Sequence, residues 1–462
     1  MEQDFRRSLI EKAKEKTYLG KLVILSGISG SGKNFIADIL LDRYNYVLID
    51  KYVTRPFRDK EVTEMSLGKN IGIKAVNGVY NDGEKSVEEQ ERNANIRKQA
   101  FLNLRLPFSY INYGEYYGFS ATEINNYLES GRNVTIIVND IGIVRDLKSI
   151  YGENCLACFV YRVNPNNKGI FMQIAGQRHD TQESAEARHK QAVKDFNTYT
   201  NNVALYDYTI LNTGIGKDDI SKILEDLTAR EFESIQTEKS TKCGSPKIYA
   251  YIGNPGSGKD DVLEIARVQG MLHSLIVPKH TTRARREDDG EEMICPGDLG
   301  FDIDSCDILY TNYGTRYGIN SNEIRERLDD GISSSIVVSN EYALAELAKR
   351  FPEELVKVYI QGLSKQEYIA QHQEHLSEPY VQCRILEYEK ADNLYQRNLS
   401  TINHVIINTG DLKDLKMQMD NIIALYENGR NLSLEEFRSY MNVTQKYIAR
   451  FERKLPQQEQ FK

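Results

Sequence analysis

Two glycine-rich segments, each ending in a lysine, are the residues whose types and spacing most clearly indicate chemistry. Both follow the pattern GxxxxGK, from Gly27 to Lys33 and from Gly253 to Lys259, and both lie between an apolar, strand-like run and a helical pattern. Glycines let the backbone curl so that successive N–H groups point at one anion, while the lysine reaches the outer phosphates. The pattern predicts two phosphate-binding loops, and the alternative is a glycine-rich turn that binds nothing.

The residue after each lysine bears on metal binding. The usual motif has a Ser or Thr there, whose hydroxyl holds Mg²⁺, whereas this chain has Asn34 and Asp260. An asparagine offers a neutral carbonyl oxygen; an aspartate could bind the metal but brings negative charge close to the phosphates. The residues expected to bind ATP are Gly27, Gly30, Ser31, Gly32, Lys33, Asn34, Gly253, Gly256, Ser257, Gly258, Lys259 and Asp260.

The glycine loops belong to a longer internal repeat. Five segments of the first half recur in the same order in the second. The pairs are 22–35 with 248–261, 54–58 with 282–286, 113–118 with 313–318, 131–140 with 331–340, and 209–214 with 405–410. The order predicts an internal duplication.

Each copy alternates short apolar strands with amphipathic helical stretches, which is typical of a parallel sheet flanked by helices. We therefore expect an α/β chain with two tandem P-loop domains, at 1–236 and 247–428, joined by a polar linker and followed by a helical tail at 429–462. The charged stretch 59–100 has no clear match in the second copy and predicts a mobile insertion.

Composition narrows the class of protein. A chain of 462 residues exceeds what one core usually supports, and a net charge of −8 argues against a general nucleic-acid binder. No run of apolar residues is long enough to predict a membrane span, and the charged N-terminus lacks a signal-peptide core. Six cysteines without framework spacing favour a reducing compartment, so we expect a cytoplasmic protein.

Beyond the loops, the order of motifs resembles guanylate kinases over roughly 20–230 and 246–428. In that family a TTRxxR segment grips the acceptor's phosphate; this chain has TRPFR at 54–58 and TTRARR at 281–286. The YGxxYG segments resemble the family's glycine–tyrosine turn, whose second tyrosine contacts the same phosphate. The resemblance implies an acceptor-phosphate site at Arg55, Arg58, Tyr117, Arg283, Arg286 and Tyr317. The alternatives are solvated surface arginines and tyrosines packed in tight turns.

The family's guanine-reading positions, a glutamate nine residues before that tyrosine and a serine two after it, are apolar here. They hold Phe108, Phe119, Ile308 and Ile319. Apolar groups cannot read a base edge by hydrogen bonds, so guanine specificity is not expected. A shift of register would instead bring in Ser109, Ser120, Asp307 and Asn320.

The resemblance also implies lid arginines and metal ligands. Arg178 and Arg188 match the family's lid in the first copy, and Arg384 in the second. The family's acidic strand end corresponds to Asp140, which with Asn34 would hold Mg²⁺; a solvated strand end fits Asp140 equally well.

Together these features predict an ATP-dependent nucleoside monophosphate kinase with Mg²⁺ as cofactor. Phosphoryl transfer needs positioning and charge neutralisation, and the expected catalytic residues are Lys33, Arg178, Arg188, Lys259 and Arg384. Two alternatives stay open: a degenerate module that binds nucleotide or phosphoprotein without turnover, and a kinase for another small phosphorylated acceptor. The expected partners are ATP and the acceptor, with no membrane; the oligomeric state stays open.

Overall fold

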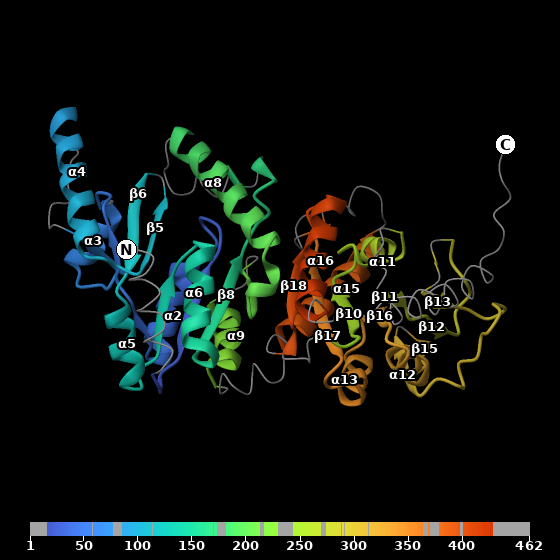
Figure 1. Ribbon diagram of the computed structural model, residues 1–462. Coiled ribbons are helices and arrows are strands. Elements are labelled where there is room, and N and C mark those ends of the chain that lie inside the picture. The colour runs from blue at the N-terminus through green and yellow to red at the C-terminus, as the bar shows by residue number, and fades with distance from the viewer. Residues whose placement is uncertain are drawn as a thin grey trace. The chain divides into compact units, whose positions relative to one another are not determined.

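The computed structural model describes residues 16–427, with gaps at 58, 77–85, 113, 170, 173–181, 213–216, 230–243, 269–273, 288, 291, 313, 364–367, 370–377 and 398–400. The chain divides into two compact units, Met1–Thr198 with Leu205–Ser234, and Tyr199–Ala204 with Ile235–Lys462. Each unit contains a main sheet and a smaller sheet (Figure 1). The tail expected at 429–462 lies outside the described residues.

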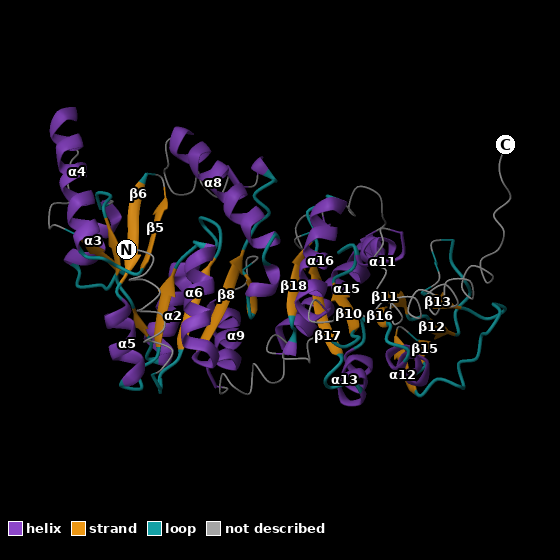
Figure 2. Ribbon diagram, in the orientation of Figure 1, coloured by secondary structure: helices purple, strands orange, loops and turns teal. Residues whose placement is uncertain are grey.

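The first unit is built on a five-stranded parallel sheet in the order β2-β7-β1-β8-β9. Its strands are β1 Leu22–Ser26, β2 Val47–Leu48, β7 Val134–Ile137, β8 Cys155–Tyr161 and β9 Tyr208–Leu211. Central strand β1 is buried at every residue, because a parallel sheet covered on both faces requires a continuous apolar run. Helices α2 (Lys33–Tyr44) and α6 (Ile141–Tyr151) pack on this sheet (Figure 2). The other long helices of this sheet are α5 Ala121–Glu129, α8 Gln182–Thr200 and α9 Lys217–Ala229.

A smaller sheet in this unit has the order β4-β3-β6-β5. Its strands are β3 Lys51–Val53, β4 Ile73–Ala75, β5 Phe108–Asn112 and β6 Glu115–Phe119. Strands β5 and β6 form an antiparallel hairpin, β3 pairs antiparallel with β6, and β4 adds in parallel to β3.

The second unit repeats this plan. Its main sheet has the order β11-β16-β10-β17-β18 and its smaller sheet the order β13-β12-β15-β14. The strands are β10 Ile248–Gly253, β11 Ser274–Ile276, β12 Lys279–Thr281, β13 Met293–Ile294, β14 Ile308–Asn312, β15 Thr315–Ile319, β16 Ser333–Val337, β17 Leu355–Gln361 and β18 His404–Ile407. The helices are α11 Lys259–Val268, α12 Ser321–Asp329, α13 Glu341–Arg350, α15 Glu378–Arg397 and α16 Leu412–Glu427.

The structure describes much of the stretch 59–100, which the sequence predicts as a mobile insertion without a clear match in the second copy. Residues 59–66 form helix α3, and strand β4 extends the small sheet just as β13 extends that of the second unit. Helix α4 (Val87–Asn103) has no counterpart between β13 and β14, and a capping box of Ser86 and Glu89 starts it. The described residues between β12 and β14 of the second unit contain no helix, so this stretch of the first unit adds α3 and α4 beside a strand that both units share.

None of the described helices combines the length and apolar character needed to cross a membrane.

Candidate active site

The first glycine loop joins central strand β1 to helix α2. Gly27, Gly30 and Gly32 have positive φ of 147°, 88° and 100°, conformations that glycine adopts without a side-chain penalty. Lys33 begins the helix, and its ammonium donates to the backbone oxygens of Gly27 at 2.6 Å and Ile28 at 2.8 Å. Ser31 is fully buried in the loop. The helix N-terminus and the lysine therefore lie at the same curled loop, an arrangement that suits the binding of an anion.

The second glycine loop has the same form between β10 and α11. Lys259 donates to the backbone oxygens of Gly253 at 2.9 Å and Asn254 at 2.6 Å, and Gly256 and Gly258 have φ of 69° and 89°. Burial lowers the pKa of the Lys259 ammonium to about 8, although Asp260 opposes the shift.

The remaining loop residues are placed alike in the two units, and Asn34 is exposed as Asp260 is. Ser257 is buried, as Ser31 is in the first loop, and Asp260 is exposed in the first turn of α11.

An asparagine that the motifs did not assign holds each loop. Asn212 follows β9, and its side-chain amide donates to the backbone oxygen of Ser31 at 2.8 Å; Asn408 follows β18 and donates to that of Ser257 at 3.0 Å. A Cβ on Gly32 would lie 2.3 Å from the Asn212 amide nitrogen. Only glycine therefore fits there. The recurring Asn-Thr-Gly of 209–214 and 405–410 was the signal in the sequence.

The first predicted acceptor arginine, Arg55, is held by a carboxylate of helix α3, which follows it in the chain. Arg55 follows β3 and makes two bonds to Glu61, of 2.6 and 2.8 Å, with both side chains mostly buried. Burial alone would lower the pKa of Arg55, but hydrogen bonds to Glu61 and to Tyr117 outweigh it and raise the pKa. The structure thus brings Arg55 and Tyr117 together. Arg58 lies outside the described residues.

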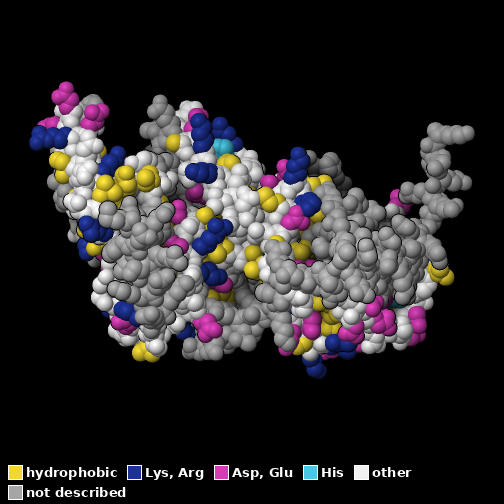
Figure 3. All heavy atoms as spheres, viewed as in Figure 1, with side chains coloured by type: hydrophobic (Ala, Val, Ile, Leu, Met, Phe, Trp, Pro, Cys, Tyr) yellow, Lys and Arg dark blue, Asp and Glu magenta, His cyan; other side chains and the backbone are white. Residues whose placement is uncertain are grey.

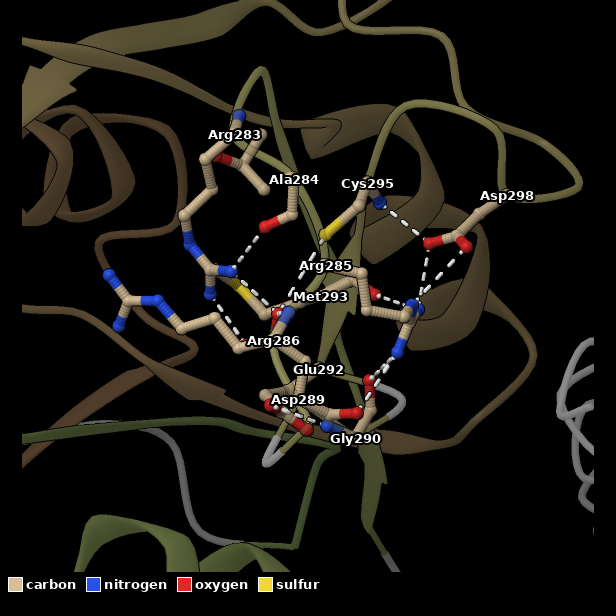
Figure 4. A network of polar contacts seen from close by, with 11 residues as sticks. Arg283, Ala284, Arg285, Arg286, Asp289, Gly290, Glu292, Met293, Cys295 and Asp298 are labelled. Carbon is tan, nitrogen blue, oxygen red and sulfur yellow. Dashed lines mark hydrogen bonds and ion pairs between the residues drawn. The ribbon is translucent and has the colours of Figure 1, made fainter. Parts of the chain in front are cut away.

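Arg283 of the second unit is held in the same way (Figure 4). It makes bonds of 2.5 and 2.6 Å to Asp289, whose carboxylate is only 7% exposed. Hydrogen bonds to Asp289 and Tyr317 raise the pKa of Arg283. Burial would raise the pKa of Asp289, but the bonds from Arg283 and the Arg286 backbone lower it.

The next two arginines of this segment have different places. Arg285, which the motif did not assign, pairs with Asp298 at 2.7 Å and also donates to nearby backbone oxygens. The side chain of Arg286 is exposed and extends away from the Asp298 side of the network (Figure 4). The structure therefore brings the predicted acceptor residues Arg283 and Tyr317 together, and the acceptor role of Arg286 stays a prediction.

Both acceptor tyrosines belong to stacked pairs. Tyr117 stacks on Tyr110 with ring centroids 5.3 Å apart, and Tyr317 stacks on Tyr310 at 5.5 Å. Each pair spans adjacent strands of the small sheet at directly opposed positions.

The four apolar residues at the family's base-reading positions are buried, and they face each other across the hairpins. Phe108 pairs with Phe119, and Ile308 with Ile319. Each hairpin therefore pairs these apolar positions with each other and not with their polar neighbours. The polar neighbours have other tasks: Ser120 and Asn320 cap helices α5 and α12, Asp307 binds Ser321 and Arg350, and Ser109 is exposed on the other face. These four positions therefore offer no side-chain hydrogen bonds to a guanine edge.

The first unit has a cavity of about 1150 Å³ that is lined by several of the predicted site segments. Its lining includes Lys33, Asn34, Glu61, Ile137 and Arg188. It therefore joins the glycine loop, the segment that holds Arg55, and helix α8. Basic side chains gather over α8 on the face seen in Figure 3.

The other two expected lid arginines are less defined. Arg178 lies outside the described residues, and Arg384 belongs to α15, where its side chain is not described. Of the lid residues, the structure thus places only the side chain of Arg188.

The expected metal ligand Asp140 caps helix α6, accepting from the backbone N–H of Ile143 at 3.0 Å. Its neighbour Asn139 faces the loop instead: its amide oxygen accepts from Gly27 N–H at 3.3 Å and its amide nitrogen donates to Asp195 at 3.2 Å. Burial raises the pKa of Asp195, a residue of α8 that the motifs did not assign, although Gln191 and Lys33 oppose the shift. Within the described ranges, no group of three or more acidic, His or Cys side chains is placed to hold a metal.

Comparison with known proteins finds similarity to guanylate kinases. The guanylate kinase of Clostridium acetobutylicum is 26% identical over 204 residues, covering 44% of this chain and 83% of the relative. That of Fusobacterium nucleatum is 25% identical over 218 residues, covering 45% and 97%. A solved guanylate kinase from Anaplasma phagocytophilum covers 43% of this chain and 95% of its own at 17% identity, with a TM-score of 0.29. No protein-family model matches. The chain thus contains a guanylate kinase-like region, which supports a kinase-like enzyme.

Proposed function

We propose that this chain is an ATP-dependent phosphotransferase with two tandem guanylate kinase-like domains, which transfers a phosphoryl group to the phosphate of a nucleoside monophosphate. The cavity of the first unit carries the proposal, because Lys33, the partner of Arg55, and Arg188 reach the same space. The donor loop and the carboxylate that holds Arg55 line one cavity, an arrangement that suits transfer between two phosphates. The repeated strand orders and loop geometry extend the proposal to the second unit.

Each group has a role that follows from its position. The loop amides and Lys33 would bind the donor's outer phosphates, while Arg55 and Tyr117 would fix the acceptor phosphate. Arg188 would neutralise charge from the side of α8. The acceptor phosphate is already ionised at neutral pH, so no general base is required.

Lys259, Arg283 and Tyr317 would take the corresponding roles in the second unit. Arg384 would act from α15 there, as Arg178, which precedes α8 in the sequence, would in the first unit.

Magnesium would enter with ATP. Asn34 lines the cavity next to Lys33 and offers an amide oxygen, whereas one carboxylate oxygen of Asp140 is taken by its helix cap. The donors present fit a metal held mainly by phosphate oxygens, with Asn34 as a protein ligand and Asp140 acting through water. The ion would neutralise charge on the donor's phosphates.

A second candidate is a kinase for a different small phosphorylated acceptor. The buried pairs Phe108–Phe119 and Ile308–Ile319 favour it, because neither can satisfy the N–H groups of a guanine edge. A module that binds without turnover is the third. The carboxylates that hold Arg55 and Arg283 favour this third candidate, because an acceptor phosphate must compete with them.

The deciding experiment measures ADP release from ATP with each common ribo- and deoxyribonucleoside monophosphate. The proteins are the wild type, Lys33→Ala, Lys259→Ala and the double variant. The proposal expects one acceptor to give turnover that at least one single variant strongly reduces and the double variant abolishes. If ATP binds but no monophosphate is phosphorylated, the nucleotide-kinase proposal fails and the other two candidates remain.

A further inference from the structure

A lysine stands four residues before the acceptor arginine in both units: Lys51 before Arg55, and Lys279 before Arg283. Each begins the short strand that pairs with the strand of the acceptor tyrosine. Burying an ammonium even partly costs hydration free energy, so a lysine repeated at one interior position needs a physical reason.

In the first unit, Lys51 lies on the face of the small sheet that carries the acceptor tyrosine. The antiparallel register pairs Val53 with Tyr117, which places Lys51 opposite Phe119 on the same face. Its ammonium is 5.8 Å from the centroid of each of these two rings. Lys51 is therefore one row away from the residue expected to hold the acceptor phosphate.

The same ammonium reaches the main sheet. It donates to the backbone oxygen of Ile137 at 3.0 Å, and Ile137 ends β7 at the edge of the sheet from which β1 leads into the glycine loop. Ile137 and Lys33 line the same cavity. The charge of Lys51 thus lies between the acceptor tyrosine and the edge of the sheet that carries the donor loop.

The second unit shows the same placement through electrostatics. The register pairs Thr281 with Tyr317, so Lys279 lies opposite Ile319 on that face. Burial is the largest cause of the lowered pKa of Lys279, with Arg283 adding to it and Glu292 opposing it. The charge of Lys279 in turn contributes to the lowered pKa of Lys259. These charge effects agree with the register and support a place for Lys279 near both the donor lysine and the acceptor arginine.

We propose that Lys51 and Lys279 are catalytic cations that bind the phosphoryl group as it passes from donor to acceptor. The inference rests on the proposed function. An acceptor-phosphate oxygen forms a bond to the γ-phosphorus of ATP, while the bond from that phosphorus to the β–γ bridging oxygen breaks and its electron pair leaves with ADP. Charge on the transferred group's oxygens then lies between the two phosphate-binding ends, where a third cation stabilises it.

A purely structural role makes a different prediction. The bond from Lys51 to Ile137 could serve only to fasten the small sheet to the main sheet. Loss of such a fastening would lower stability and weaken every ligand of the unit alike. A cation placed between the two ends affects only ligands that extend past the donor loop.

The test compares two ligands that need no acceptor. ADP ends at its β-phosphate within the donor loop, whereas adenosine 5′-tetraphosphate extends two phosphates further. Calorimetric titration of the full-length Lys51→Met/Lys279→Met variant should show the tetraphosphate weakened about ten- to hundredfold, as for one hydrogen bond between charged groups, with ADP changed less than about twofold. Lys51→Arg/Lys279→Arg retains the cation and should keep most of the preference for the tetraphosphate.

Other outcomes overturn the inference, and they distinguish its failure from a failure of the proposed donor loops. Equal losses for both ligands, with a lowered melting temperature, assign the lysines a structural role. No loss for either ligand removes them from the site. If Lys33→Ala/Lys259→Ala leaves ADP binding intact, or the wild type binds neither ligand, the proposed donor loops fail and the inference falls with them. Normal ADP binding through the loops with an unaffected tetraphosphate rejects this inference alone.

Discussion

Replacing Asn212 with alanine should loosen the first glycine loop and weaken nucleotide binding at Lys33. The asparagine is fixed from two sides: its backbone N–H donates to Tyr161 at 2.7 Å and its side-chain amide donates to the backbone oxygen of Ser31 at 2.8 Å. The amide therefore links the end of the main sheet to the crest of the loop. The substitution removes this link and leaves the loop's own glycines unchanged.

The magnitude follows from the one bond that is lost. A neutral hydrogen bond contributes about 0.5–1.5 kcal/mol net, which corresponds to about a two- to tenfold loss of affinity if it stabilises the binding conformation. Asn212→Asp should be worse than alanine. It keeps the shape but turns a carboxylate oxygen toward the Ser31 oxygen, and it adds negative charge near the phosphates.

The assay is an equilibrium titration with a fluorescent ADP analogue in a Lys259→Ala background, so that the signal reports on the first loop. Asn126→Ala, a substitution of an exposed residue of α5, is the control. Melting temperatures separate loosening of the loop from loss of the fold. If Asn212→Ala and Asn212→Asp both bind the analogue as tightly as the control, the amide does not hold the loop and the reasoning is refuted.

Three further outcomes are expected. Gly32→Ala should abolish nucleotide binding at the first loop in the same titration, whereas Gly68→Ala, also at positive φ but with open space around it, should not. ADP affinity of the second loop should fall as pH rises through about 8, where Lys259 loses its proton; urea unfolding should show the opposite sign, with stability rising from pH 8 toward 10.5 because the folded state favours the neutral amine. Asp289→Asn should lower the free energy of unfolding by about 1–3 kcal/mol, because the guanidinium of Arg283 loses its charged partner; an unchanged urea midpoint would contradict this.

Much of the donor site could be predicted because its signal is local. A glycine pattern between a strand and a helix specifies the loop's shape within a few residues, and the structure forms that shape at Lys33 and at Lys259. The internal repeat was equally visible in the sequence, and the two main sheets have corresponding strand orders.

The remaining features depend on partners that are distant in the sequence. Asn212 meets its loop residue across 181 positions, so its repeat was visible but its task was not. Strand β4 is three residues long and is specified only by pairing with β3, so the sequence of 59–100 does not reveal that this strand corresponds to β13. Asp140 was expected near a metal, yet a carboxylate at the start of a helix is also a good cap, and no spacing rule distinguishes the two.

Some features of the site occur in both units, and others are described in the first unit alone. Both units share five features to which the proposals assign a part in phosphate binding. They are the loop lysine, the asparagine that holds the loop, the arginine bound to a carboxylate, the stacked tyrosines and the lysine that precedes the arginine. Helix α4 and the pairing of Asn139 with Asp195 are described only in the first unit. Under the proposed function, both units would bind phosphate through these shared groups and would differ in the body of the acceptor. Substrate screens should therefore test each loop variant separately, because the two units are expected to prefer different acceptors.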